Sequence, residues 1–218
     1  NTTLDLSGNG NDGGFGSGPV SINSSCAIGN CLTFSTGGNS YVDIPDSSSI
    51  RLPNSTFTIA VWLRFIDNTG TQRILTKFEG NFDGQTYAII ALSGAGLFGF
   101  RSDDINPNQI DATTAITDTN WHHFAVTRNQ TNFTIYLDGR QDASSAGTGS
   151  LTYVGQPLRL ANTLNGSLDD LKLWNRTLSA AEISALYNSG NPTNATGLER
   201  NATRLEHRGG NASLTGLV

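Results

Sequence analysis

The chain has 218 residues, a formal net charge of −5, and 13 lysines and arginines that form no cluster. This balance builds no basic surface for phosphates or anionic lipids, so nucleic acids and membrane surfaces are excluded as main partners. Its apolar runs are far shorter than the roughly 20 residues of a membrane-spanning helix, and no membrane insertion is expected. The 25 glycines and many Ser, Thr and Asn residues suit short strands and tight turns. We therefore expect one all-β domain followed by a tail.

Alternation of apolar and polar residues predicts a series of strands. The pattern is clearest at residues 57–65, where large apolar side chains recur at every second position and must share one face. The strand at 133–137 runs into Asp138-Gly139, a strong hairpin signal. A total near twelve strands fits two packed antiparallel sheets. In chain order, the expected strands are 32–34, 41–44, 57–65, 73–78, 87–92, 97–101, 124–126, 133–137, 158–161 and 168–174.

One short helix is expected near the C-terminal end, from Ser179 to Tyr187. Ser179 is a good N-cap, and Glu182 stands three residues later, as in a capping box. Gly190 and Pro192 are typical of residues that end a helix.

Four segments of the sequence form motifs of several consecutive residues. They are residues 4–13 (LDLSGNGNDG), 57–63 (FTIAVWL), 121–127 (WHHFAVT) and 168–183 (LDDLKLWNRTLSAAEI). Together they resemble the laminin-G-like, concanavalin A-like family over roughly residues 4–190. The resemblance implies an all-β jelly roll, a two-sheet antiparallel β-sandwich with one short C-terminal helix. It says less about function, because this fold hosts lectins, adhesion modules, structural domains and glycanases.

The resemblance also predicts the organisation of the chain. We expect a laminin-G-like domain over 1–190 that lacks its first strand, which would precede Asn1. Residues 191–218 are expected to be a glycosylated linker, with a short helix at 198–207 as an alternative. The end of the chain, with Leu214, Leu217 and Val218, resembles the opening of the family's first strand. Three explanations are open for this segment: it continues into a next repeat, it adds a strand to the sheet of a neighbouring copy, or it pairs with the sheet of its own chain.

Sequons and cysteines point to an extracellular or cell-surface protein. Cys26 and Cys31 can close a small disulfide hairpin in an oxidising compartment. The Asn-x-Ser/Thr triplets are more frequent than chance gives, although a chain rich in Ser, Thr and Asn also makes some by accident. The ten candidate sites for N-linked glycans are Asn1, Asn23, Asn54, Asn129, Asn132, Asn165, Asn175, Asn194, Asn201 and Asn211.

No catalytic constellation is evident. Retaining glycanases need two carboxylates about 5–5.5 Å apart, and three of the four glutamates of this chain lie in the predicted helix or the tail. His122 and His123 belong to a packing phrase, and His207 lies in the tail, so no base is poised beside a nucleophile. We predict that the protein is not an enzyme.

Calcium is the one metal that the sequence favours. Asp5, Asn9, Asn11 and Asp12 offer hard oxygen ligands in a glycine-rich loop, and the family resemblance adds Asp169 or Asp170. The alternative is a tight turn in which these side chains hydrogen-bond their own backbone.

Two functional hypotheses follow. The first is an extracellular structural or adhesive domain that assembles head-to-tail with copies of itself, as a tandem repeat or a filament subunit. The second is a carbohydrate-binding module. Trp62, Trp121 and Trp174 lie in structural phrases, which leaves looser sugar-binding candidates. These are Phe82, Tyr87, Tyr153 and the loops 103–111 and 162–165.

Overall fold

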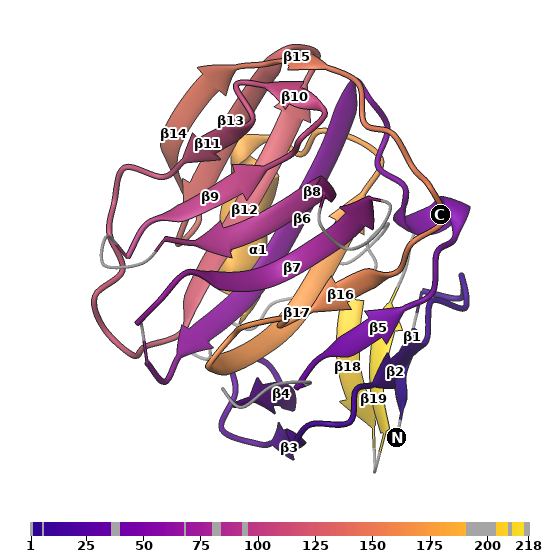
Figure 1. Cartoon of the computed structure of the whole chain (residues 1–218). Helices are drawn as coiled ribbons and strands as arrows, with labels where there is room; N and C mark the ends of the chain where they lie inside the picture. The colour runs from indigo at the N-terminus through magenta and orange to yellow at the C-terminus, as the bar shows by residue number, and fades with distance from the viewer. Residues whose placement is uncertain are drawn as a thin grey trace.

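The computed structural model describes residues 2–5, 7–35, 40–67, 69–79, 84–92, 96–190, 204–208 and 211–215. In these residues two β-sheets pack face to face, and a helix lies behind the smaller sheet (Figure 1). The predicted all-β sandwich is therefore confirmed.

The larger sheet has ten strands, and Figure 1 looks onto its outer face. Neighbouring strands are antiparallel, except that β1 and β19 run parallel. In spatial order the strands are β11 (Gln109–Asp111), β9 (Phe98–Arg101), β8 (Gly84–Ala91), β7 (Gln72–Glu79), β16 (Leu158–Leu160), β5 (Val42–Ile44), β2 (Gly13–Phe15), β1 (Thr2–Asp5), β19 (Asn211–Thr215) and β18 (Arg204–Arg208).

The smaller sheet has seven strands, and two short strands pair separately. Every strand expected from alternation is present, and the expectation missed strands such as β14, whose polar sequence alternates weakly. The seven strands are β14 (Arg140–Ala146), β13 (Asn132–Leu137), β12 (His122–Asn129), β6 (Thr56–Phe65), β17 (Gly166–Trp174), β4 (Cys31–Phe34) and β3 (Val20–Asn23). The separate pair is β10 (Ile105–Asn106) and β15 (Thr148–Gly149), and a 3-10 turn, η1, spans Ser48–Ile50.

The core lies between the two sheets and is rich in aromatic rings. The five apolar side chains of β6 predicted to share a face, from Phe57 to Phe65, are each at most 1% exposed. They meet the opposite sheet directly: the ring centroids of Phe57 and Phe100 lie 5.7 Å apart, and those of Phe65 and Phe98 lie 5.5 Å apart. These contacts bury apolar surface from both sheets, which is the main favourable contribution to folding.

The helix α1 (Ala180–Gly190) begins with the predicted capping box. The backbone N–H of Ser179 donates to the Glu182 carboxylate at 2.8 Å, and the backbone N–H of Glu182 donates to Ser179 Oγ at 3.3 Å. The carboxylate also accepts from Arg176 at 2.7 Å, and this bond lowers the pKa of Glu182 to about 2. The helix extends three residues beyond the predicted Tyr187.

α1 packs on the outer face of the seven-stranded sheet. Trp62, on the face of β6 opposite the core, stacks on Tyr187 with ring centroids 5.4 Å apart. A second apolar cluster joins helix and sheet, with members Ala60, Ala125, Tyr136, Trp174, Leu178, Ile183 and Leu186. β6 is thus buried on both faces, and Trp62 and Trp174 have the packing role expected from the sequence.

Two neighbouring histidines of β12 have opposite surroundings. His123 is buried beside Trp62, and burial, with Lys172 nearby, lowers its pKa to about 3 although Asp138 opposes the shift. The ring of His122 contacts Asp138 at 2.8 Å and Asp118 at 3.0 Å. The Asp138 hydrogen bond, with that of Asp118, raises the pKa of His122 against the effect of partial burial.

The C-terminal strands pair with the chain's own sheet. β18 and β19 form an antiparallel pair, and β19 lies beside β1 with Ala212 opposite Thr3 and Leu214 opposite Asp5. Residues 204–208 are therefore a strand rather than the end of the alternative helix, while Leu217 and Val218 lie outside the described residues. The domain boundary at residue 190 and the exchange of this segment between copies stay predictions.

We predict that Gly190→Ala destabilises the domain. A Cβ at this position would lie 2.3 Å from Trp62 Nε1 and 2.7 Å from Trp62 Cε2, so the indole stacked on Tyr187 has to shift. Overpacking of this kind costs about 1–3 kcal/mol. Urea unfolding measures the loss, and Gly14→Ala is the matched control because its Cβ meets no atom within 4 Å. Equal stability of the two variants would contradict the packing described here.

The two histidines are predicted to give opposite pH dependences. The unfolded chain binds a proton at residue 123 below about pH 6.5, whereas folded His123 stays neutral down to about pH 3. This difference in proton binding therefore lowers the free energy of unfolding as pH falls from about 6.5 to about 3, by up to about 1.4 kcal/mol per pH unit. His122 has a raised pKa, so its linkage stabilises the fold below about pH 6.5 and is lost as pH rises through the folded pKa.

The measurement is the free energy of unfolding in urea from pH 4 to pH 8 for the wild type, His123→Phe and His122→Gln. His123→Phe should flatten the loss of stability in acid, because phenylalanine keeps a ring beside Trp62 and cannot bind a proton. His122→Gln should lose more stability at pH 5 than at pH 8. Parallel pH profiles for all three proteins would refute the assignment.

Candidate functional site

The outer face of the ten-stranded sheet is the candidate binding surface. Of the residues that the structure describes, the only α-helix lies on the other sheet, so no helix covers this face (Figure 1). Because side chains alternate along a strand, residues between the core positions of the central strands point to this outer face.

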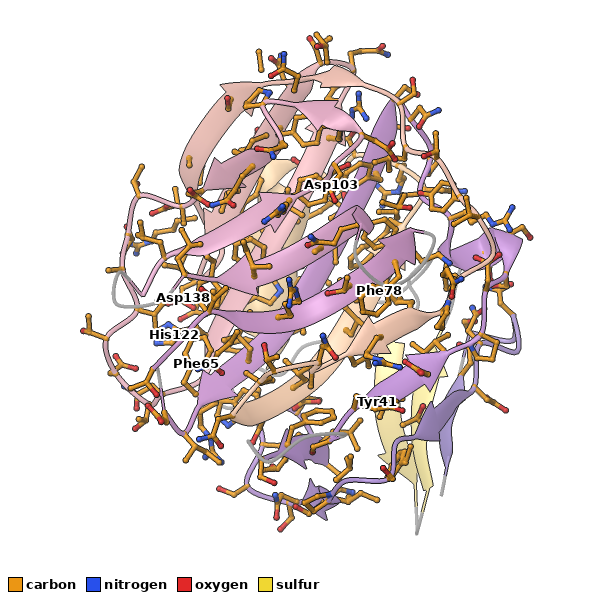
Figure 2. The ribbon with its side chains drawn as sticks, viewed as in Figure 1. Tyr41, Phe65, Phe78, Asp103, His122 and Asp138 are labelled. Carbon is orange, nitrogen blue, oxygen red and sulfur yellow. A yellow bond between two sulfur atoms is a disulfide. The ribbon has the colours of Figure 1, made fainter. Side chains whose placement is uncertain are left out.

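An arginine with aromatic neighbours lies at the centre of this face. The guanidinium carbon of Arg159 lies 3.7 Å from the ring centroid of Tyr41 and 5.5 Å from that of Phe78. The same guanidinium makes two 2.7 Å hydrogen bonds to the carboxylate of Asp43 on the adjacent strand β5. This bidentate pair raises the pKa of Arg159 and fixes the plane of the group. Figure 2 labels Tyr41 and Phe78 on this face.

A row of residues continues from Arg159 across three more strands. In the sheet register Arg159 lies opposite Thr76, Thr76 opposite Ala88, and Ala88 opposite Arg101. With neighbouring strands about 4.8 Å apart, the row from Arg159 to Arg101 spans about 14 Å. Thr76 and Ala88, between the two arginines, are fully buried.

Three polar atoms along this part of the sheet have no hydrogen-bond partner among the described residues. They are Thr76 Oγ1, Gln85 Oε1 and Arg101 Nε. Thr76 is fully buried and Gln85 is 3% exposed. A buried polar atom without a partner costs about 1–3 kcal/mol. Because these three atoms are buried, a ligand resting on the sheet face does not reach them.

The far end of the row is closed by acidic groups. Asp103 accepts a hydrogen bond from the backbone N–H of Gln85 at 2.8 Å and pairs with Arg101 at 3.4 Å. Asp111 lies over Gly99, where an added Cβ would come within 2.3 Å of its carboxylate, and accepts two bonds from Gln109. The loop 103–111 named from the sequence thus borders the face.

The aromatic candidates named from the sequence are placed differently. Tyr87 is fully buried in the core, and its hydroxyl donates to the carbonyl of Ile50, so it has a packing role and is not a sugar-binding ring. Tyr153 is partly buried and donates to the carbonyl of Leu52 at 2.9 Å. Phe82 lies outside the described residues. Sequence reasoning missed Tyr41, Phe78 and Arg159, because these residues come from separate segments and share no motif.

The glycine-rich loop has the geometry of the hydrogen-bonded turn. The Asp5 carboxylate accepts from the backbone N–H groups of Ser7 and Asn11 at 2.7 and 2.8 Å, and Asp12 accepts from the N–H of Asp5 at 2.7 Å. In the described residues, no three His, Cys, Asp or Glu side chains gather as metal ligands do. The backbone N–H of Asn9 donates to Ser7 Oγ in the same loop at 2.9 Å. Both oxygens of Asp5 and one oxygen of Asp12 thus accept hydrogen bonds within the loop, and calcium stays a prediction.

The other predicted members of that site are held elsewhere. Asn11 is buried and its side-chain oxygen accepts bonds from Ser47 and Ser49 at 2.6 and 2.8 Å. Asp169 belongs to β17 of the other sheet and accepts a bond from the N–H of Ile28 at 2.6 Å. The structure therefore does not bring Asp169 into the hydrogen bonds of the loop.

The disulfide expected between Cys26 and Cys31 is present. Cys26 lies in the connection between β3 and β4, and Cys31 is the first residue of β4. Of the ten sequon asparagines, six have described side chains: Asn23, Asn54, Asn129, Asn132, Asn165 and Asn175. The side chains of Asn1, Asn194, Asn201 and Asn211 lie outside the described residues.

No helix of the described ranges is long and apolar enough to cross a membrane.

Sequence comparison gives two findings. A family model described as the concanavalin A-like lectin/glucanases superfamily, Laminin_G_3, matches residues 36–184. Usherin from Mus musculus is 26% identical over 163 residues, which are 66% of this chain and 3% of that protein. The chain thus corresponds to a very small part of this relative.

Several solved structures share the fold. The binding domain of Paraclostridial Mosquitocidal Protein 1 superposes with a TM-score of 0.66 at 22% identity, over 87% of this chain and 52% of that one. A botulinum neurotoxin type C structure, whose cell entry depends on two ganglioside molecules, gives 0.64 at 17% identity over 88% and 52%. Domain 4 of AbnA, an extracellular arabinanase from Geobacillus stearothermophilus in complex with arabinotriose, gives 0.61 at 16% identity over 78% and 82%.

The chain spans about half of the toxin binding domains, and at these identities the likeness shows the fold alone. The family match covers well over half of the chain and agrees with the two-sheet sandwich described above. The protein therefore belongs to the laminin-G-like branch of the concanavalin A-like lectin/glucanases superfamily.

Proposed function

We propose that this domain is an extracellular, non-catalytic module that binds glycans on the outer face of its ten-stranded sheet. The observation that carries the proposal is the Arg159 cluster, in which a guanidinium held by Asp43 is stacked on Tyr41 on a face that no described helix covers. Rings and planar groups bind sugars by stacking, and fixed hydrogen-bonding groups beside them orient the ligand.

The charges of the face favour neutral glycans. Arg159 pairs with Asp43, and Arg101 pairs with Asp103, so each guanidinium is matched by a carboxylate. The whole chain has a net charge of −5. An anionic glycan would have to compete with these carboxylates, whereas hydroxyl groups can bond to both members of each pair.

Related folds make this use plausible. The AbnA domain is in complex with arabinotriose, and cell entry of the botulinum type C toxin depends on interaction with two ganglioside molecules.

The test is binding of the full chain to arabinotriose and to an array of immobilised neutral and acidic oligosaccharides. For any glycan bound, we expect Arg159→Ala to weaken affinity at least about tenfold, which is about 1.4 kcal/mol. The matched control is Arg64→Ala, because Arg64 stacks on Trp121 at 5.3 Å at the rim of the other sheet and should not affect binding.

Binding that is unchanged in Arg159→Ala, or absent on the whole array, would rule out this face as a glycan site.

A second candidate function is self-assembly through the C-terminal strands. β19 adds to the sheet beside β1 in parallel register, from Thr3 to Asp5. In the structure this pairing lies within one chain. Exchange of the same strand between copies, as in domain swapping and strand addition, would produce the predicted head-to-tail assembly, in which a copy of the same chain is the partner.

The expected result is a set of oligomers whose population rises with concentration in light-scattering chromatography. Ser213→Pro should abolish them, because Ser213 lies opposite Leu4 in the parallel pairing and proline has no N–H for the ladder. Ser213→Ala keeps the N–H and should leave the oligomers intact. A wild-type chain that remains monomeric at all concentrations would exclude this candidate.

A further inference from the structure

Four sequon asparagines share one end of the seven-stranded sheet. Asn54, Asn129, Asn132 and Asn175 are far apart in the sequence, yet each is exposed. An asparagine that carries a glycan must be exposed in the folded protein, because a buried position has no room for a branched, hydrated sugar chain. All four meet this requirement.

Hydrogen bonds and strand register place the four together. Asn129 lies opposite Asn132 in the β12 and β13 pair, and its other neighbour, in β6, is Thr56. Thr56 Oγ1 donates to the carbonyl of Asn175 at 3.3 Å. Asn54 lies two residues before Thr56. The four side chains therefore belong to one strand end, where β6 begins and β12 and β17 finish.

The two other described sequons differ in surroundings. Asn23 is half-buried, and its side-chain nitrogen, the atom that a glycan would use, donates to Thr33 Oγ1 at 2.6 Å. Asn165 is half-buried between the sheets, with its backbone N–H bonded to Gln72 and its carbonyl to the N–H of Ile66. At Asn54, by contrast, the bonded atom is the side-chain oxygen, which accepts from Leu151 at 2.7 Å.

We propose that Asn54, Asn129, Asn132 and Asn175 are the N-glycan acceptors among the described sequons, and that their glycans form a cap on this end of the domain. The donor is a lipid-linked oligosaccharide diphosphate. Transfer forms a bond between the asparagine Nδ2 and the anomeric carbon of the oligosaccharide and breaks the bond from that carbon to the diphosphate oxygen. The lipid diphosphate leaves, and Nδ2 loses one proton.

The cap would divide the surface of the domain. The strands β5, β16, β7, β8 and β9, which form the open face, contain no asparagine. Asn129 and Asn132 lie in the other sheet, and Asn175 directly follows the last residue of β17 in that sheet. Glycans there would block protein contacts at one end and leave the open face of the ten-stranded sheet accessible.

The experiment is site-by-site glycan occupancy of the full 218-residue chain, secreted from a cell line that performs N-glycosylation. Enzymatic deglycosylation in ¹⁸O-labelled water converts each occupied asparagine to labelled aspartate, and peptide mass spectrometry reads each site. We expect most molecules to be modified at all four sites and to be bare at Asn23 and Asn165. Sites outside the described side chains are read separately and do not enter the comparison.

Two sets of variants provide the control. Changing the four asparagines to glutamine should remove four glycan masses from the intact protein, whereas Asn23→Gln with Asn165→Gln should remove none. Occupancy is also read on the unaltered chain, so a variant that fails to fold does not leave the result open. Substantial modification of Asn23 or Asn165, or a bare asparagine at any of the four, overturns the proposal.

Discussion

The burial of β6 on both faces is the constraint on which the rest of the structure depends. One face of this strand fills the sandwich core, and the other packs under α1, with Ile59 and Trp62 at 0% and 3% exposure. A strand with two apolar faces needs a cover on each side. The helix is therefore committed to the seven-stranded sheet, and among the described residues none is left to cover the ten-stranded sheet. The open face follows from where the apolar residues of β6 lie.

The packing of α1 on the seven-stranded sheet also bears on the burial of the polar residues of β17. All nine of its residues are buried, although the strand contains Asp169, Asp170 and Lys172. Buried charges are tolerated only when paired or hydrogen-bonded, and Lys172 contacts Asp170 at 2.9 Å while Asp169 accepts a backbone bond from Ile28. The charged residues of β17, which belong to a segment that resembles the family, thus have a structural role. Lys172 also supplies the positive charge beside neutral His123.

Most of the fold was predictable because it follows local rules. Alternation located β6 and its antiparallel partners, and the Ser179 and Glu182 pair located the start of α1. Alternation alone does not decide which face of a strand meets the core, and Tyr87, a looser sugar-binding candidate from the sequence, is fully buried. β14 was missed because its residues are mostly polar and it makes few core contacts.

The candidate binding face was not predictable for a different reason. Tyr41, Thr76 and Arg159 meet only because β5, β16 and β7 become neighbours through connections that span much of the chain. No spacing in the sequence reports such a meeting, whereas the sequons and the cysteines are motifs that can be read residue by residue. The motifs in this sequence predict N-glycosylation and a disulfide, and each of these depends only on residues that are close together in the chain. Recognition depends on the sheet register, because only the register brings an aromatic ring and a paired guanidinium onto one uncovered face.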